Sequence, residues 1–330
     1  MHDPSRPARL PHLVAGFAVV YLVWGSTFLG IKFAVETIPP FLMAACRFLA
    51  SGAILYAFLR LRGVAAPTAR QWRFGAWTGA LLLLGGNGLV TWGQQTVPSG
   101  KAALIIATTP LWMVLLEWLL YRGERPSLRV WFGLAAGFGG AGLLVHPSGD
   151  ASGGTVAGFV ALFAAPLCWS VGSLESRRLR PSEDPILTSA MQMLAGGALM
   201  LAVGSLLGEW PALMGRTVST RSLLALAYLT VFGGIIAFTT YAWLLRVASP
   251  TAVSTYAYVN PLVAVLLGWL VVDEAVDARV GVAAFLILGA VLLITLRAKK
   301  GESLPVRPLI PPERGVQSNH RAEGELVRGG

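Results

Sequence analysis

Ten apolar runs, each about 20 residues long, constrain the fold of this chain more than any other feature. A helix of about 20 apolar residues crosses the hydrocarbon core of a bilayer. Charged residues make up only 13% of the 330 residues, roughly half of the share in a typical soluble protein. The runs lie at about 12–36, 40–59, 74–95, 99–121, 129–146, 154–174, 186–207, 221–243, 250–272 and 280–297.

These runs are predicted to be helices rather than barrel strands. Backbone N–H and C=O groups in hydrocarbon must be hydrogen-bonded within a helix or within a closed barrel. Barrel strands alternate apolar and polar residues, and the runs show no such alternation. The predicted fold class is therefore an all-α membrane protein with ten transmembrane helices, short connections and no soluble domain.

Basic residues predict how the chain is oriented in the membrane. Of its 26 Lys and Arg residues, 20 lie in the two terminal segments and the loops on the same side as them. Five lie in the opposite loops, and Arg47 lies within a run. Because basic loops stay in the cytoplasm, both termini are expected to be cytoplasmic in a multi-pass protein of the cell (plasma or inner) membrane. The first run follows Arg6 and Arg9 without a convincing signal cleavage site and is interpreted as a retained span.

Neither nucleic acid nor catalysis is indicated. The net charge of +10 comes from short basic clusters between the apolar runs, whereas a nucleic-acid surface needs a continuous basic face. The four His residues are scattered, and the chain has no HExxH, Walker or Ser-His-acid motif. No catalytic residue, no metal site and no cofactor is therefore expected, and the chain is predicted not to be an enzyme.

The two halves of the chain resemble each other. At a shift of 145 residues, Trp24 aligns with Trp169 and Pro40 with Pro185. The pattern PLxxVLLxWL that begins at Pro110 recurs 151 residues later. Each half contains five runs, an odd number, so the second half would enter the membrane from the opposite side. We predict an inverted repeat, an architecture with which transporters alternate between two open states.

The duplication defines the expected domain organisation. Residues 1–11 form a cytoplasmic N-terminal segment, 12–146 the first repeat with helices 1–5, 154–297 the second repeat with helices 6–10, and 298–330 a cytoplasmic tail. The tail is expected to be disordered because Pro, Gly and charged residues are scattered through it without apolar periodicity.

Several short motifs resemble one known family. They are YLVWGSTF from Tyr21, IPPFLMAACRFL from Ile38, TPL from Thr109 with Arg122-Gly-Glu124, and NPL from Asn260 with Glu274. With these motifs, residues 12–297 resemble the EamA-type branch of the drug/metabolite transporter superfamily. The resemblance implies two inverted five-helix repeats around a central cavity built from helices 1, 3, 4, 6, 8 and 9. It also implies export of small metabolites or toxic compounds.

Polar and aromatic residues inside the runs are the candidates for substrate binding. Tyr256 and Asn260 share a helix face just before Pro261, which removes a backbone hydrogen bond. Trp24 and Trp169 lie in mid-span rather than at the membrane interface, where Trp is usually found. The alternative for each is ordinary helix packing. The candidate set is Trp24, Thr27, Asn87, Trp92, Thr109, Trp169, Tyr241, Tyr256 and Asn260.

Three charged residues also attract interest. Glu117 lies about five residues inside one end of its run, where a carboxylate can accept a proton or anchor a cation. It is a candidate coupling residue, with an interfacial ion pair to a nearby arginine as the alternative. Arg47 is expected to form a structural charge pair with Glu36 and so to hold the first two helices together. Substrate contact by Arg47 is the other interpretation.

The predicted function is secondary transport. The chain is expected to export small amphipathic or zwitterionic metabolites or drugs by alternating access. Its expected partners are a small-molecule substrate, the lipid bilayer and, as an open alternative, protons. A multiply anionic substrate is disfavoured because few charges within the spans could compensate it. The alternative is a membrane protein without transport, such as a lipid-modifying enzyme or an assembly scaffold.

Overall fold

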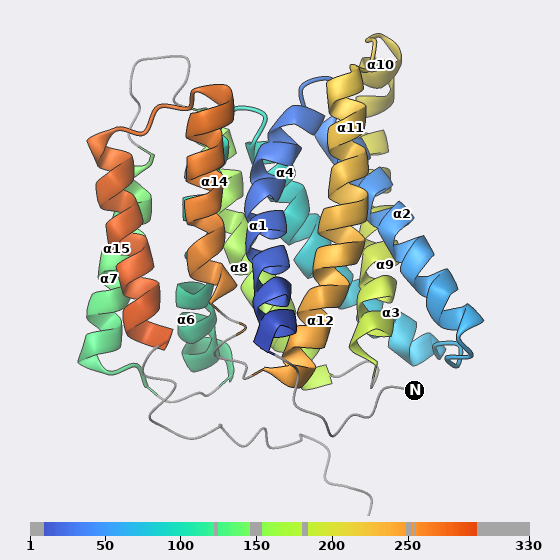
Figure 1. Cartoon of the computed structure of the whole chain (residues 1–330), viewed down its shortest axis with the longest axis horizontal. Coiled ribbons are helices and arrows are strands. Elements are labelled where there is room, and N and C mark those ends of the chain that lie inside the picture. Colours follow the sequence, from blue (N-terminus) through green and yellow to red (C-terminus); the bar gives the residue numbers. More distant parts are fainter. Residues whose placement is uncertain are drawn as a thin grey trace, which may run out of the picture.

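The computed structural model describes residues 10–121, 125–145, 154–179, 184–248, 253 and 255–295. Within these ranges the chain is a bundle of helices without a β-strand (Figure 1). The end of the bundle that carries the loops 35–39, 94–98 and 273–277 is called the upper end, as drawn in Figure 1. The segment before residue 10, the tail from residue 296, and Arg122 with Glu124 lie outside the described residues.

The elements follow one another up and down the bundle. In order they are α1 Leu10–Ala34, α2 Pro40–Leu61, α3 Ala69–Gly79, η1 Ala80–Gly88, α4 Leu89–Gly93, α5 Ser99–Ile106, α6 Thr109–Tyr121, α7 Leu128–Leu143, α8 Val156–Leu179, α9 Pro185–Leu206, α10 Glu209–Met214, α11 Thr220–Tyr228, η2 Leu229–Ile236, α12 Ala237–Val247, α14 Tyr256–Val272 and α15 Ala278–Thr295. The elements η1 and η2 are π-helical, and each continues directly into the α-helices before and after it.

Seven helices in the described part of the chain are long and apolar enough to cross a membrane. They are Leu10–Ala34, Pro40–Leu61, Ala69–Gly93, Ser99–Tyr121, Val156–Ser176, Pro185–Leu206 and Thr220–Tyr241. Shorter apolar helices occupy Leu128–Leu143, Tyr256–Val272 and Ala278–Ile294. The prediction of an all-helical, multi-pass membrane protein is confirmed, whereas ten spans in two inverted repeats remain a prediction.

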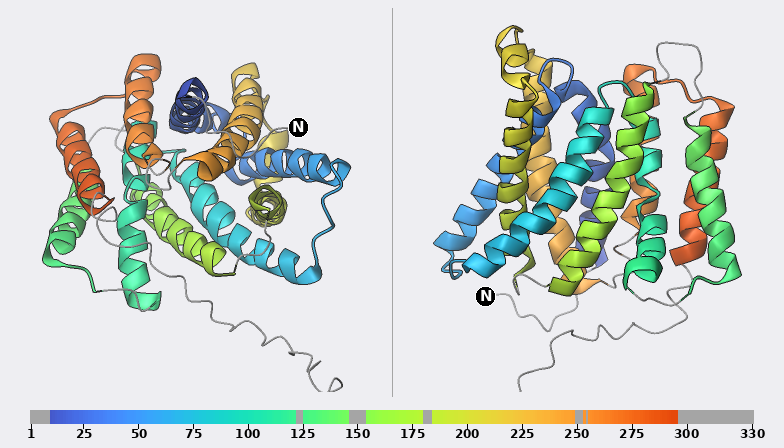
Figure 2. Two further views of the ribbon diagram at one scale, coloured as in Figure 1. Left: turned by 60° about the horizontal axis from the view of Figure 1, so that its bottom comes forward. Right: turned by 180° about the vertical axis from the view of Figure 1, so that it is seen from behind.

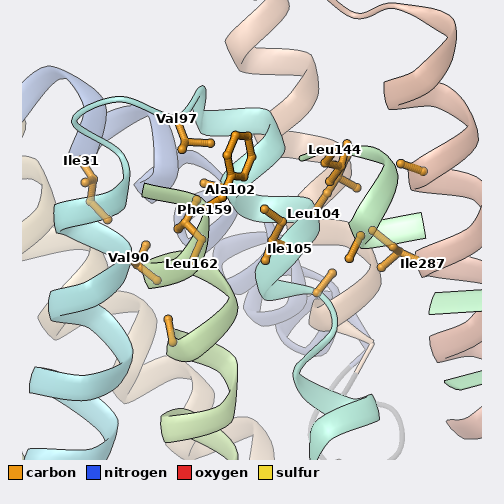
Figure 3. Packing of buried hydrophobic residues seen from close by; sticks show 14 of the residues in the cluster. Ile31, Val90, Val97, Ala102, Leu104, Ile105, Leu144, Phe159, Leu162 and Ile287 are labelled. Atoms are coloured by element: carbon orange, nitrogen blue, oxygen red, sulfur yellow. The ribbon is translucent and has the colours of Figure 1, made fainter. Parts of the chain in front are cut away.

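Many large apolar side chains face outward. Phe132 is 74% exposed and Phe285 is 78% exposed, on helices α7 and α15. So much exposed apolar surface would be unfavourable in water and is suited to contact with lipid. The core lies between the helices. Leu104 and Ile105 of α5 are fully buried against side chains that include Phe159 and Leu162 of α8 (Figure 3).

Small residues let the central helices approach each other. Helix α2 packs along α9, and α7 packs along α15 at one edge of the bundle (Figures 1 and 2). A Cβ atom at Gly52 of α2 would lie 2.9 Å from the Cβ of Met193 on α9. A Cβ atom at Gly197 of α9 would lie 2.9 Å from Cγ of Leu49. Glycine at these contacts brings the two backbones close, as small residues do between membrane helices.

The upper end of α2 is closed by a carboxylate. Pro40 is the first residue of this helix, where the missing N–H of proline is not needed. The next two N–H groups, of Phe41 and Leu42, donate to Glu209 at 3.2 and 2.8 Å. Because a carboxylate at a helix N-terminus satisfies unpaired donors and complements the helix dipole, Glu209 anchors α2 to α10.

Candidate functional site

Three aromatic residues from distant parts of the sequence meet inside the bundle. Trp24 of α1 lies with its ring centroid 5.0 Å from that of Tyr241 on α12 and 5.2 Å from that of Tyr256 on α14. The two tyrosine rings are 5.7 Å apart and perpendicular. Tilted and edge-to-face geometries are those that aromatic pairs prefer. We call these three residues the aromatic cluster. It unites three of the predicted substrate-binding residues.

The helix that supplies Tyr256 is joined to α1 by polar contacts. The hydroxyl of Tyr21 is hydrogen-bonded to the hydroxyl of Thr255, just before α14. With its amide oriented to satisfy its donors, buried Asn260 donates to the carbonyl oxygens of Tyr21 and Tyr256, each at 3.2 Å. Gly25 makes this approach possible, since a Cβ there would lie 3.1 Å from the carbonyl oxygen of Asn260. Asn260 therefore links two helices beside the aromatic cluster.

Trp24 also contacts a π-helical segment. Its indole N–H donates to the carbonyl oxygen of Gly233 in η2 at 3.3 Å. Thr27, one turn along α1, is buried and donates to the carbonyl oxygen of Trp24 at 2.5 Å. Trp169 lies elsewhere, on α8, where a Cβ at Gly86 of η1 would be 2.8 Å from its ring. The two tryptophans thus occupy separate sites, each against a π-helical segment, and π-helical turns are frequent at functional sites.

Three other candidates bond to a nearby backbone carbonyl group or pack in a core. The Thr109 hydroxyl donates to the carbonyl oxygen of Ile106 at 2.6 Å. The amide of Asn87 reaches the carbonyl oxygen of Leu82 in η1 at 3.5 Å. Trp92 packs against the apolar cluster between α2 and α9. In the described part of the chain, none of the three forms a hydrogen bond or a ring contact with the aromatic cluster, and their part in substrate binding remains a prediction.

Arg47 and Glu36 are not brought together, contrary to the expected charge pair. A carboxylate oxygen of Glu36 instead lies 3.7 Å from a guanidinium nitrogen of Arg221 at the start of α11. The reason is height in the bundle. Glu36 follows the upper end of α1, whereas Arg47 is the eighth residue of α2 and lies about 10 Å further down. Arg221 is at the same level as Glu36.

Glu117 lies half-buried on α6. In the part of the chain that the structure describes, it has no ion-pair partner, and Arg125 is exposed. The alternative pair with Arg122 falls outside the described residues. A coupling role for Glu117 therefore remains a prediction.

A polar network at the upper end was not anticipated. The ammonium of Lys32 on α1 lies 2.6 Å from a carboxylate oxygen of Glu274, in the loop after α14. The same carboxylate accepts from the N–H and hydroxyl of Ser99, at 2.8 and 2.9 Å, and from the N–H of Gly100 at 2.9 Å. Glu274 therefore caps α5 and ties α1, α5 and α14 together. No sequence signal predicts this cap, because Glu274 lies 175 positions from Ser99.

The electrostatics of this network hold Glu274 in its charged form. Burial of the carboxyl group by itself would raise its pKa. The Lys32 ammonium and the N–H groups of Gly100 and Ser99 outweigh burial, and the pKa lies below the ordinary value of 4.5. The side chain of Glu274 is only 8% exposed. The contact is therefore a partly buried ion pair with every carboxylate oxygen satisfied.

An apolar helical bundle with an aromatic and polar cluster at its centre defines a membrane protein of the transporter class. The chain belongs to the EamA-like transporter family, whose model matches residues 13–146 and 156–296. It is 38% identical over 305 residues to the uncharacterized inner membrane transporter YedA of Escherichia coli (strain K12). The aligned region covers 92% of this chain and 95% of YedA.

Two further comparisons agree with this membership. The chain is 27% identical over 289 residues to Protein PecM of Dickeya dadantii, covering 87% of this chain and 93% of PecM. A solved crystal structure superposes with a TM-score of 0.60 at 24% identity, covering 88% of this chain and 100% of that one. At this identity the structural likeness establishes the fold alone. The family prediction made from the motifs is confirmed.

Proposed function

We propose that the protein is a secondary transporter that exports small amphipathic or zwitterionic solutes by alternating access, with the aromatic cluster as the wall of its binding site. The observation that carries this proposal is the cluster itself. It gathers Trp24 from the first half of the chain with Tyr241 and Tyr256 from the second, at the contact between the halves. A solute held there would contact both halves and could be released to either side as they move.

The arrangement of the helices supports two inverted repeats, residues 12–146 and 154–297. Helix α1 of the first repeat packs against η2 of the second repeat. Helix α8 of the second repeat packs against η1 of the first repeat. The two π-helical segments begin at Ala80 and Leu229, a separation of 149 residues that is close to the repeat shift. Exchanged contacts of this kind are expected when two similar halves are related by an axis in the membrane plane.

The upper end of the bundle is proposed to face the outside of an inner membrane. The excess of Lys and Arg in the lower loops supports cytoplasmic termini. On this orientation, the contact between Lys32 and Glu274 lies on the outer side, about 12 Å above Trp24 along α1. It joins the two halves above the aromatic cluster. We infer that it contributes to closing the outer entrance, and that export requires this contact to break.

A growth screen followed by a flux assay tests the proposed function. Strains that overexpress the wild-type chain are compared with an empty-vector strain on toxic concentrations of amino acids, their analogues and other small metabolites. Solutes against which the chain protects are then tested by counterflow in proteoliposomes. We expect protection and counterflow for wild type, and loss of both for Trp24→Ala.

Phe132→Ala is the matched control for this test. Phe132 is an aromatic residue on the outer surface of α7 and is 74% exposed, so its removal should leave flux unchanged. The proposal is abandoned if the chain protects the strain against none of the solutes and moves none of them. It is also abandoned if Trp24→Ala transports as well as wild type. A chain that acts as a lipid-modifying enzyme or scaffold would give the first of these outcomes.

A further inference from the structure

Arg47 is a buried cation that has no counter-ion among the described residues. It lies on α2 and is 6% exposed. Its Nε atom is buried without a hydrogen-bond partner, and in the described residues no carboxylate lies within 4.0 Å of the guanidinium. The ring of Phe48, 4.7 Å from Cζ, covers it as a cation–π partner. At least one donor of the guanidinium, the Nε–H group, is therefore left without an acceptor in this part of the chain.

Two carboxylates close to the upper ends of α1 and α2 have other partners. Glu209 accepts from the N–H groups that begin α2, and Glu36 contacts Arg221. A charged side chain within a membrane protein is costly and is normally paired or used in function. In the part of the chain that the structure describes, an arginine therefore lies inside the bundle without a carboxylate that compensates its charge.

The guanidinium lies against the same residue of η2 that Trp24 contacts. A Cβ atom at Gly233 of η2 would lie 3.2 Å from Nη2 of Arg47 and 3.2 Å from Cγ2 of Thr27. A larger residue at this position would press against the guanidinium. The carbonyl oxygen of the same glycine accepts the indole N–H of Trp24. Arg47, Thr27 and Trp24 thus meet at one residue of η2.

A second contact holds α2 in this position. Ser51, one turn below Arg47, donates to the carbonyl oxygen of Thr230 in η2 at 3.0 Å. A Cβ atom at Gly234 would collide with the Ser51 hydroxyl. The two adjacent glycines of η2 therefore leave space for the Arg47 and Ser51 side chains of α2. The orientation of the arginine is determined by this packing.

We propose that Arg47 binds the carboxylate of the transported solute and so selects solutes with a single negative group. This inference rests on the proposed transport function. The planar fork of a guanidinium matches a carboxylate and binds it with two parallel hydrogen bonds. One cation compensates one charge, so a doubly charged phosphate would keep an uncompensated charge. A cationic group on the same solute would meet the faces of Trp24 and Tyr241, which attract cations.

Matched pairs of carboxylates and carboxamides test the proposal. The purified full chain in nanodiscs is titrated with L-phenylalanine, L-threonine and 3-phenylpropionate, and with the carboxamide of each. Binding is measured as a rise in Tm, and members that bind are tested in counterflow. We expect at least one carboxylate to bind, and its amide to bind at least about 10-fold more weakly, because the amide loses the charge that strengthens its hydrogen bonds to the guanidinium.

Variants at Arg47 separate binding from folding. Arg47→Gln should weaken carboxylate binding by about 10-fold or more, and Arg47→Lys should recover part of it because the charge is retained. Without solute, the Tm of Arg47→Gln should equal or exceed that of wild type, because an uncompensated cation has been removed. Arg221→Gln, at an exposed arginine on α11, should bind as wild type does.

Three results would overturn the role of Arg47. The first is that no carboxylate of the panel binds, or that the amides bind equally well. The second is that Arg47→Gln retains carboxylate affinity. The third is that Arg47→Gln lowers the Tm of the solute-free protein while Arg47→Lys restores it without restoring selectivity for carboxylates. Counterflow of a neutral or cationic solute by both wild type and Arg47→Gln would leave transport standing and remove only this inference.

Discussion

The Lys32 ammonium and the Glu274 carboxylate meet at 2.6 Å across the upper end of the bundle. The two residues lie 242 positions apart in the sequence, one on α1 and the other in the loop after α14. The same carboxylate caps α5. One side chain therefore determines how three helices from both halves of the chain meet above the aromatic cluster.

Glu274→Gln is expected to loosen this end of the bundle. The amide keeps the size of the carboxylate but loses the ion pair and weakens the cap on α5. A thiol introduced at Thr27, in a chain with Cys46→Ala and Cys168→Ala, should then react several-fold faster with a membrane-impermeant maleimide added from outside. The control is Arg221→Gln, which removes a half-exposed ion pair of little energetic weight. Equal labelling rates in the two variants would contradict a closing role for Glu274.

The contact should be insensitive to pH through the neutral range. Because the pKa of Glu274 in the folded state is lowered from 4.5, its stabilising contribution is complete above that value and is lost as the pH falls through the lowered pKa. The difference in Tm between wild type and Glu274→Gln should stay constant from about pH 8 to about pH 5 and shrink below that. A difference that vanishes between pH 6 and pH 7 would show that another group controls the contact.

Glu117→Gln tests proton coupling. A half-buried carboxyl group inside a span can bind a proton on one side and release it on the other. Once a solute is known, its flux in proteoliposomes should rise with an imposed pH gradient for wild type and not for Glu117→Gln. Solute counterflow without a gradient should persist in the variant. If both proteins respond equally to the gradient, Glu117 is not the coupling residue.

Gly25→Ala should destabilise the protein and displace α1 from α14. The added Cβ would lie 2.6 Å from the Cβ of Val263, on a helix that cannot shift without disturbing Asn260. We expect a cost of about 1–3 kcal/mol, as for other overpacked contacts, seen as a lower Tm. Gly139→Ala is the control, since a Cβ at this exposed position of α7 has no atom within 4 Å. Equal Tm values for the two variants would show that the contact at Gly25 can adjust.

Part of the candidate site was predictable from residue type and spacing. Trp24 stands out as an indole in mid-span, and Tyr256 as a polar residue close to a proline; the structure brings both together with Tyr241. Spacing alone could not exclude Thr109 or Asn87, whose side chains bond to backbone carbonyl groups a few residues earlier in the chain. Whether a polar side chain meets its own backbone or another helix depends on how the helix is rotated in the bundle.

The charged residues show where sequence reasoning fails. Position along the chain suggested that Arg47 pairs with Glu36, because the two are close in sequence and of opposite charge. The connection between α1 and α2 instead leaves them at different heights, and α11 brings Arg221 to Glu36. Lys32 and Glu274 had no sequence relationship that would predict their contact. Ion pairs between helices that are distant in the sequence depend on the relative depth of the two helices. Small changes in helix tilt alter this depth.

The sequence by itself determined that this chain is a helical, multi-pass membrane protein of the EamA-like transporter family. Hydrophobicity over about 20 residues and short motifs are local properties, and they need no knowledge of neighbouring helices. Only the tertiary structure decided that α1 lies against η2 and α14, that Glu274 caps α5, and that Arg47 has no carboxylate partner among the described residues. These contacts depend on how each helix is rotated and how deep it lies in the bundle. Both are set by the packing of its side chains against other helices.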